Sequence, residues 1–210
     1  NPGTNTTYAW TNDNTAISLG ASGSGATPLF TSSNLLKEPI FGTIVITPTY
    51  TVATSTGAFC EGTPTSFKLY VLPTISANPI ADTTVCTGST ISAFIPSTDA
   101  TAFSGSSVKF KWTVAGSGIN LLSNSLPQNQ VSAFTATNSG TSDLQATITV
   151  TPVYNFNGAA CDGIPTSYKI TVKPNPSVAS AGADAKICGV TEYTLAAISP
   201  VVGTGVCTQT

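Results

Sequence analysis

The sequence predicts an all-β protein built from Greek-key β-sandwich domains that follow one another end to end. Three observations lead to this fold class. The 210 residues repeat with a period of about 102, apolar and polar residues alternate in short segments, and Gly, Asn and Pro separate those segments. No segment shows the spacing of apolar residues typical of a helix, so the expected elements are strands.

The repeat rests on landmarks that recur in the same order, at offsets between 101 and 104 residues. They are Trp10 and Trp112, Phe30–Asn34 and Phe134–Asn138, Ile46–Tyr50 and Val150–Tyr154, and Cys60–Lys68 and Cys161–Lys169. Because the offsets drift by only a few residues, the insertions fall between matched blocks, where loops tolerate them.

Proline-containing joints divide the chain at Pro73–Pro79 and Pro174–Pro176. Linkers between domains carry few contacts, and we expect the same of these joints. The predicted domains are an incomplete repeat over 1–75, a complete repeat over 76–176 and the beginning of a third repeat over 177–210.

Alternation with a period of two predicts strands whose apolar side chains share one face. Val108, Phe110, Trp112 and Val114 form such a face, with Lys109 and Lys111 opposite. Similar alternation runs through 146–151 and 168–173. We expect Trp10 and Trp112 to be core residues of their own repeats.

Composition excludes several classes of partner. Charged residues make up only 8% of the chain, against about 25% in a typical soluble domain. The chain has no Arg and a net charge of −2, so it lacks the basic surface that neutralises phosphates. Nucleic acid and direct membrane insertion are therefore not expected.

Five cysteines without CxxC spacing, in a chain without His, argue against zinc or another metal site. Spaced cysteines instead indicate a disulfide framework, which implies an oxidising, extracellular location. The chain begins at Asn1 and has no apolar run long enough to span a membrane. We expect an internal or processed piece of a secreted protein.

No catalytic residues and no cofactor are predicted. The usual general base, His, is absent, and the nine acidic residues are scattered singly. Ser106 and Lys109 fit an S-x-x-K motif, but they lie on a predicted strand rather than on one face of a helix.

Two binding alternatives stay open. The oxygen-rich run Asn12–Asn14 fits either a calcium loop or a structural turn. Five aromatic residues form either a sugar-binding platform or part of the core. They are Tyr8, Tyr50, Phe59, Tyr154 and Phe156.

Landmarks along nearly the whole chain resemble the PKD-like repeats of giant cell-surface proteins of Bacteroidota. They are Trp112, Val150–Pro152, Cys161–Pro165, Val172–Pro174 and Val85–Gly88. The resemblance implies Ig-like or PKD-like sandwiches in long arrays, as in gliding-motility adhesins of the SprB type exported by the type IX secretion system. The stretch from Cys188 to Gly205 looks like the start of another Ig-like module.

The order Cys86, Trp112, Cys161 resembles the Cys…Trp…Cys layout of immunoglobulin-like sandwiches. This resemblance implies a Cys86–Cys161 disulfide, while Cys60 and Cys188 would pair outside the chain. A Cys60–Cys86 bridge between neighbouring repeats is the alternative, and Cys207 has no assigned role. The family resemblance also implies O-glycosylation at Thr83, within Asp82–Thr84.

The resulting functional expectation is a stalk or spacer within a large secreted adhesin or filament that serves surface adhesion or gliding motility. Its partners would be neighbouring repeats of the same chain, surface glycans or other cell-surface proteins. The alternatives are a carbohydrate- or protein-binding module and an accessory stalk of a secreted enzyme.

Overall fold

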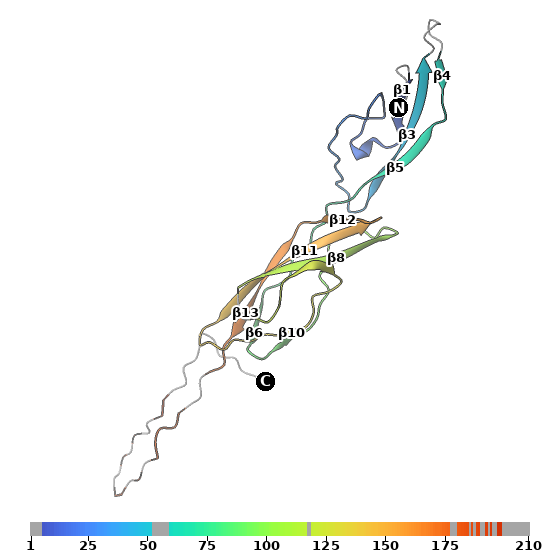
Figure 1. The fold of residues 1–210 in the computed structure, drawn as a ribbon. Coiled ribbons are helices and arrows are strands. Elements are labelled where there is room, and N and C mark those ends of the chain that lie inside the picture. Colours follow the sequence, from blue (N-terminus) through green and yellow to red (C-terminus); the bar gives the residue numbers. More distant parts are fainter. Residues whose placement is uncertain are drawn as a thin grey trace. The chain divides into compact units, whose positions relative to one another are not determined.

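A computed structural model of the chain describes residues 6–51, 59–116 and 119–176, together with scattered positions between 180 and 198. The regular elements of this described part are β-strands and one 3₁₀ turn, without any α-helix (Figure 1). The all-β prediction is confirmed. The immunoglobulin-like tandem arrangement stays a prediction.

Contacts divide the chain into two compact units. Unit 1 contains Asn1–Ser76, Asp99–Val108 and Tyr154–Ile164, and unit 2 contains Ala77–Thr98, Lys109–Val153 and Pro165–Thr210. The first break lies one residue beyond the predicted boundary at 75/76. Two segments of the predicted second repeat nevertheless belong to unit 1.

The first repeat forms an antiparallel sheet in which β3 is central. β1 pairs with one edge of β3 and with β2, while β4 and β5 pair with successive parts of the other edge. The strands are β1 (Thr6–Asn12), β2 (Ser22–Ser24), β3 (Ile40–Thr51), β4 (Phe59–Glu61) and β5 (Thr65–Val71).

The core of this sheet is built around Trp10, which is buried with Ile17, Leu19 and Ile44. Ile17 reaches the core from the 3₁₀ turn η1 (Thr15–Ile17), which leads from β1 toward β2. Within the glycine-rich segment 20–25, Ser22–Ser24 form β2. Gly23 lies so close to the Trp10 ring that a Cβ atom there would overlap it.

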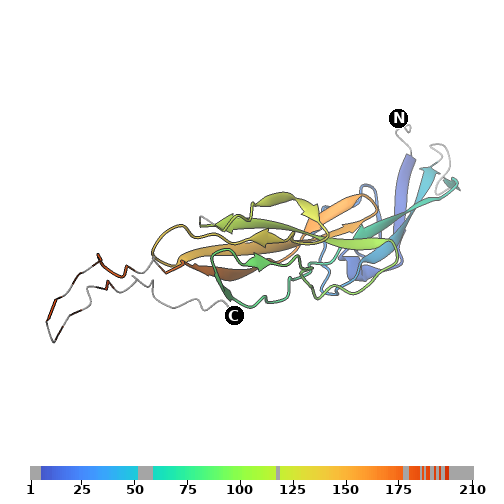
Figure 2. The same cartoon turned by 90° about the horizontal axis from the view of Figure 1, so that it is seen from below.

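The second repeat forms a larger sheet with the order β6-β13-β11-β8-β9, and β12 also pairs with β11. Its strands, green to orange, lie side by side (Figure 2). They are β6 (Thr83–Cys86), β8 (Ser106–Ala115), β9 (Asn124–Gln128), β11 (Leu144–Phe156), β12 (Ala159–Asp162) and β13 (Thr166–Lys173). A separate two-stranded sheet joins β7 (Thr90–Ile91) to β10 (Phe134–Thr135).

The two repeats share one strand plan, because β2-β1-β3-β5 corresponds in order to β9-β8-β11-β13. Trp10 and Trp112 are both buried at the same point of the plan. The backbone also repeats, since Ser18 and Asn120 both adopt left-handed conformations, with φ of 70° and 59°. The predicted alternation in β11 and β13 is confirmed, because their apolar residues are buried and the residues between them are more exposed.

Candidate binding surfaces

The last strand of the first repeat leads into a buried aromatic cluster within unit 1. Ile75 and Tyr154 are fully buried there, and Tyr70 packs against Phe156 with ring centroids 5.1 Å apart. Phe103 also packs edge-on against Phe156, with ring centroids 5.4 Å apart. Residues from both predicted repeats thus share one small core.

Polar contacts surround this cluster. The Lys37 ammonium pairs with the Asp99 carboxylate at 2.8 Å, and the other Asp99 oxygen accepts the N–H of Ser76 at 2.7 Å. Partial burial raises the pKa of Asp99, but the bonds from Lys37 and Ser76 outweigh it and hold the pKa below its ordinary value. The N–H of Ile164 also donates to the carbonyl of Ile75 at 2.7 Å.

The expectation that few contacts cross the Pro73–Pro79 joint is therefore wrong. Ile75 follows Pro73 by two residues and supplies an apolar side chain that can be buried only against the segments around it. Proline content indicated a linker, whereas the burial of Ile75 makes the joint part of a core.

The five aromatic residues considered for a sugar-binding platform do not form one exposed surface. Tyr154 and Phe156 are buried in the cluster of unit 1, so they are unavailable to a ligand. Tyr8, Tyr50 and Phe59 are exposed by 37%, 47% and 62% of their surface. Only the three aromatics of the first repeat remain candidates for binding.

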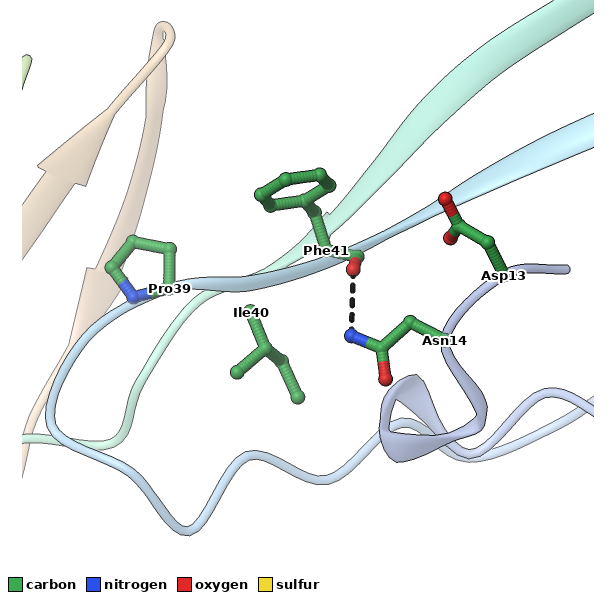
Figure 3. A pocket seen from close by; sticks show the side chains of 5 residues that line it. All are labelled: Asp13, Asn14, Pro39, Ile40 and Phe41. Atoms are coloured by element: carbon green, nitrogen blue, oxygen red, sulfur yellow. Dashed lines mark hydrogen bonds between the residues drawn. The ribbon is translucent and has the colours of Figure 1, made fainter.

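The Asn12–Asn14 run is engaged in backbone hydrogen bonds rather than arranged around a cation. The buried Asn12 amide donates to the carbonyl of Leu19 at 2.9 Å, and the Asn14 amide donates to that of Phe41 at 2.8 Å (Figure 3). Asp13 accepts the N–H of Thr43 at 2.6 Å, which holds the pKa of its carboxyl below the ordinary value. This geometry favours the structural turn.

An open hollow of about 480 Å³ lies beside this turn. Its lining combines the polar side chains of Asp13 and Asn14 with Pro39, Ile40 and Phe41 (Figure 3). Because the Asn14 amide is already bonded to the backbone of β3, the hollow offers few polar groups that are free to orient a ligand.

Ser106 and Lys109 lie on β8, as predicted, so they do not share a helical face. The Ser106 hydroxyl donates to the carbonyl of Phe103 at 2.8 Å. Within the described ranges, no three His, Cys, Asp or Glu residues are grouped closely enough to hold a metal ion. The described residues likewise include no helix with the length and apolarity needed to cross a membrane.

The predicted Cys86–Cys161 disulfide is not formed. Cys161 is a free, exposed thiol, as are Cys60 and Cys188, so the alternative Cys60–Cys86 bridge is also absent. Cys86 is disulfide-bonded, but to neither Cys161 nor Cys60. Cys207 lies outside the described residues.

Strand register explains this correction. Cys86 is in register with Lys173, the last residue of β13, whereas Cys161 precedes the first residue of that strand. The eight residues of β13 span about 27 Å. A disulfide requires Cα atoms within about 7 Å. The position of Cys86 at the far end of β13 from the segment that contains Cys161 agrees with the free thiol of Cys161.

Thr83, the expected acceptor of an O-linked glycan, is exposed at the start of β6. Asp82 before it accepts the N–H of Lys169 at 2.7 Å and thereby fixes β6 beside β13. Glycosylation at Thr83 stays a prediction.

Two structural residues escaped sequence reasoning. Asn138 is buried, and its amide donates to the carbonyls of Ser142 and Val172, both at 2.8 Å. Asn34 makes the equivalent bonds in the first repeat. Each asparagine ends one of the recurring blocks Phe30–Asn34 and Phe134–Asn138, and this recurrence in the sequence could have marked both as structural residues.

No protein-family model matches this chain, and no curated protein is significantly similar to it. The resemblance to PKD-like surface repeats therefore rests on the landmark residues of the sequence, and membership of that family is a proposal.

Proposed function

We propose that this chain is a run of structural spacer repeats in a large secreted cell-surface adhesin or filament. The observation that carries the proposal is the recurrence of one strand plan, down to the buried tryptophans Trp10 and Trp112. Repeated units that contact their neighbours are typical of arrays whose length, rather than a single site, serves the function.

The packed joint supports a stiff spacer. Bending at Ile75 would expose that side chain together with Tyr154, and both are now completely buried. The pair between Lys37 and Asp99 and the bond from Ile164 to Ile75 add directional restraints. A joint with a core of its own resists bending more than a hydrated proline linker does.

Particle length tests this proposal. A tandem protein of four complete repeats should form a rod that lengthens by roughly 40 Å per repeat, a rise comparable to the length of β11, whose 13 residues span about 44 Å. Electron microscopy and small-angle scattering measure this directly. A compact particle whose longest dimension does not grow with repeat number would contradict the proposal.

The joint itself supplies a matched test. Ile75→Asp places a charge in the buried cluster and should produce kinked particles, while each repeat keeps its strands. Thr74→Asp, at the exposed neighbouring position, should leave the rods straight.

The cell-surface location and the link to adhesion or gliding rest on the resemblance alone. Antibodies raised against this chain should label intact cells of the source organism, and mild protease treatment of those cells should remove the label. Labelling that requires permeabilised cells would contradict the proposal.

A carbohydrate- or protein-binding module is the second candidate, favoured by the exposed Tyr8, Tyr50 and Phe59. Aromatic rings that are accessible on one repeat can stack on sugars or pack against apolar protein groups. Specific binding on a glycan array that is lost in Tyr50→Ala would support this function.

A further inference from the structure

Two equivalent strands of the repeats differ in their neighbours. β13 lies between β11 and β6, whereas among the described residues β5 pairs with β3 alone. Figure 1 shows β5 at the margin of its sheet. An unpaired edge exposes a row of N–H and C=O groups that can bind another strand.

The second repeat shows what occupies this edge. β6 runs parallel to β13, with Thr83 opposite Ile170 and Cys86 opposite Lys173. The Asp82 carboxylate accepts the N–H of Lys169 at 2.7 Å, so this N–H points away from β11. In the first repeat, Lys68 holds the position of Lys169.

The segment around β6 also covers a face of the sheet. Phe94 packs edge-on against Tyr168 at 6.1 Å, and both line an apolar hollow of about 200 Å³ with Ile80 and Ile91. Tyr168 is consequently only 4% exposed. Its counterpart in the first repeat, Phe67, is 50% exposed.

A second pairing position is open as well. β10 pairs with β7, and the N–H of Ala136 donates to Ser89 at 2.9 Å. The matching segment Phe30–Thr31 of the first repeat forms no strand, and Ser32, which corresponds to the buried Ala136, is exposed. The first repeat therefore differs from the second at the edge of β5, at Phe67 and at Ser32, where residues 80–94 act in the second repeat.

We infer that β5, Phe67 and Phe30–Ser32 form an acceptor edge for one more peptide segment of the type formed by residues 80–94. The segment would add a strand parallel to β5, as β6 does to β13, and would place an aromatic side chain over Phe67. This inference rests on the proposed array of repeats, and it names the occupant as the first repeat's own counterpart of residues 80–94, which the repeat period places before Asn1.

The chemistry of the edge favours this occupant. Phe67 is exposed, and Leu69 two residues later is only partly buried, against the Trp10 core. They hold the positions of Tyr168 and Ile170, which line the apolar hollow with Ile80, Ile91 and Phe94. Backbone pairing supplies affinity, while alternate side chains in apolar contacts supply specificity for one register.

The test adds this segment to the full chain. A second copy of residues 76–102, with Ser at the position of Cys86, is fused before Asn1, where the repeat period places it. Fusion gives the segment an effective concentration in the millimolar range, so weak binding is detectable. Hydrogen exchange should slow at least tenfold at the outward-facing amides of Lys68 and Tyr70.

Three variants of the extended chain serve as controls. Val85→Pro in the added copy removes an N–H that faces the acceptor strand, because the Thr87 N–H two residues later donates to β13 in the second repeat, and it should abolish the protection. Phe67→Asp should also abolish it, whereas Phe59→Asp, at an exposed phenylalanine outside the acceptor edge, should not. Unchanged exchange at Lys68 and Tyr70, or equal protection by the Val85→Pro copy, would overturn the inference.

The outcomes remain distinct from those of the spacer test. Rod-shaped tandem proteins without protection of β5 would refute the acceptor edge and leave the spacer proposal standing. Protection of β5 within a compact particle would refute the spacer and support strand addition.

Discussion

Asn34 and Asn138 make the same set of hydrogen bonds in two stretches of chain 104 residues apart. Each side-chain amide donates at 2.8 Å to the carbonyl four residues later and to a carbonyl near the end of the final strand, at Val71 or Val172. Each side-chain oxygen accepts the N–H two residues later at 2.9 Å. One asparagine thus ties a loop to the last strand in both repeats.

Replacing this asparagine should destabilise the second repeat. Asn138→Ala leaves the buried carbonyl of Val172 without its donor, so we expect a loss of about 2–3 kcal/mol in the free energy of unfolding. Urea denaturation followed by tryptophan fluorescence measures the loss. The exposed Asn129 provides the control, because Asn129→Ala should change stability by less than about 0.5 kcal/mol. Equal effects of the two substitutions would contradict the structural role.

The buried hydroxyl of Tyr168 should make the protein less stable at high pH. Burial raises its pKa to about 12, so between pH 10 and 12 the folded state keeps a proton that the unfolded state releases. Stability should therefore fall as pH rises through this window, by up to about 1.4 kcal/mol per pH unit. Tyr168→Phe removes the titrating hydroxyl and should abolish this part of the fall. Tyr50→Phe, at an exposed tyrosine, should retain it.

Asp99 should make the protein less stable as the pH falls into the acidic range. Its pKa lies below the ordinary value, so its contribution is present above about pH 4 and is lost as pH falls further. Water screens the pair with Lys37, which limits the effect to about 1 kcal/mol. Denaturation of Asp99→Asn at pH 7 and pH 3 should show a smaller pH difference than the parent chain. Asp184→Asn, at an exposed position, should match the parent.

Gly23 is required by the position of Trp10. A Cβ atom at residue 23 would overlap the indole ring, so Gly23→Ala should cost about 1–3 kcal/mol and shift the emission of Trp10. Gly20→Ala is the matched control, because nothing lies within 4 Å of a Cβ atom at that glycine. An unchanged Gly23→Ala protein would show that β2 packs elsewhere.

The cysteine assignments predict reactivity. Cys60, Cys161 and Cys188 should react rapidly with a thiol reagent in the folded protein, since each is free and exposed. Cys161→Ser should leave stability unchanged. A loss of about 2–5 kcal/mol in the free energy of unfolding would instead show that Cys161 forms the disulfide implied by the immunoglobulin resemblance. Mass spectrometry of labelled peptides identifies the reactive positions.

The strands were predictable where alternation was strong. Tyr168, Ile170 and Val172 lie on one face because side chains of an extended chain alternate between faces, whatever surrounds the strand. β2 was missed because its residues, Ser22 to Ser24, carry no apolar pattern. It forms through pairing with β1 and the approach of Gly23 to Trp10, which are not local properties.

The sequence by itself determined the period, the strand segments and the two buried tryptophans, because repetition and alternation are properties of residue order. Only the tertiary structure decided which residues meet: it buried Ile75 within the joint, separated Cys86 from Cys161 by the length of a strand, and left Phe67 half exposed where Tyr168 is covered. The physical reason is that contacts between distant segments depend on register and on neighbouring strands, and neither is encoded in local spacing.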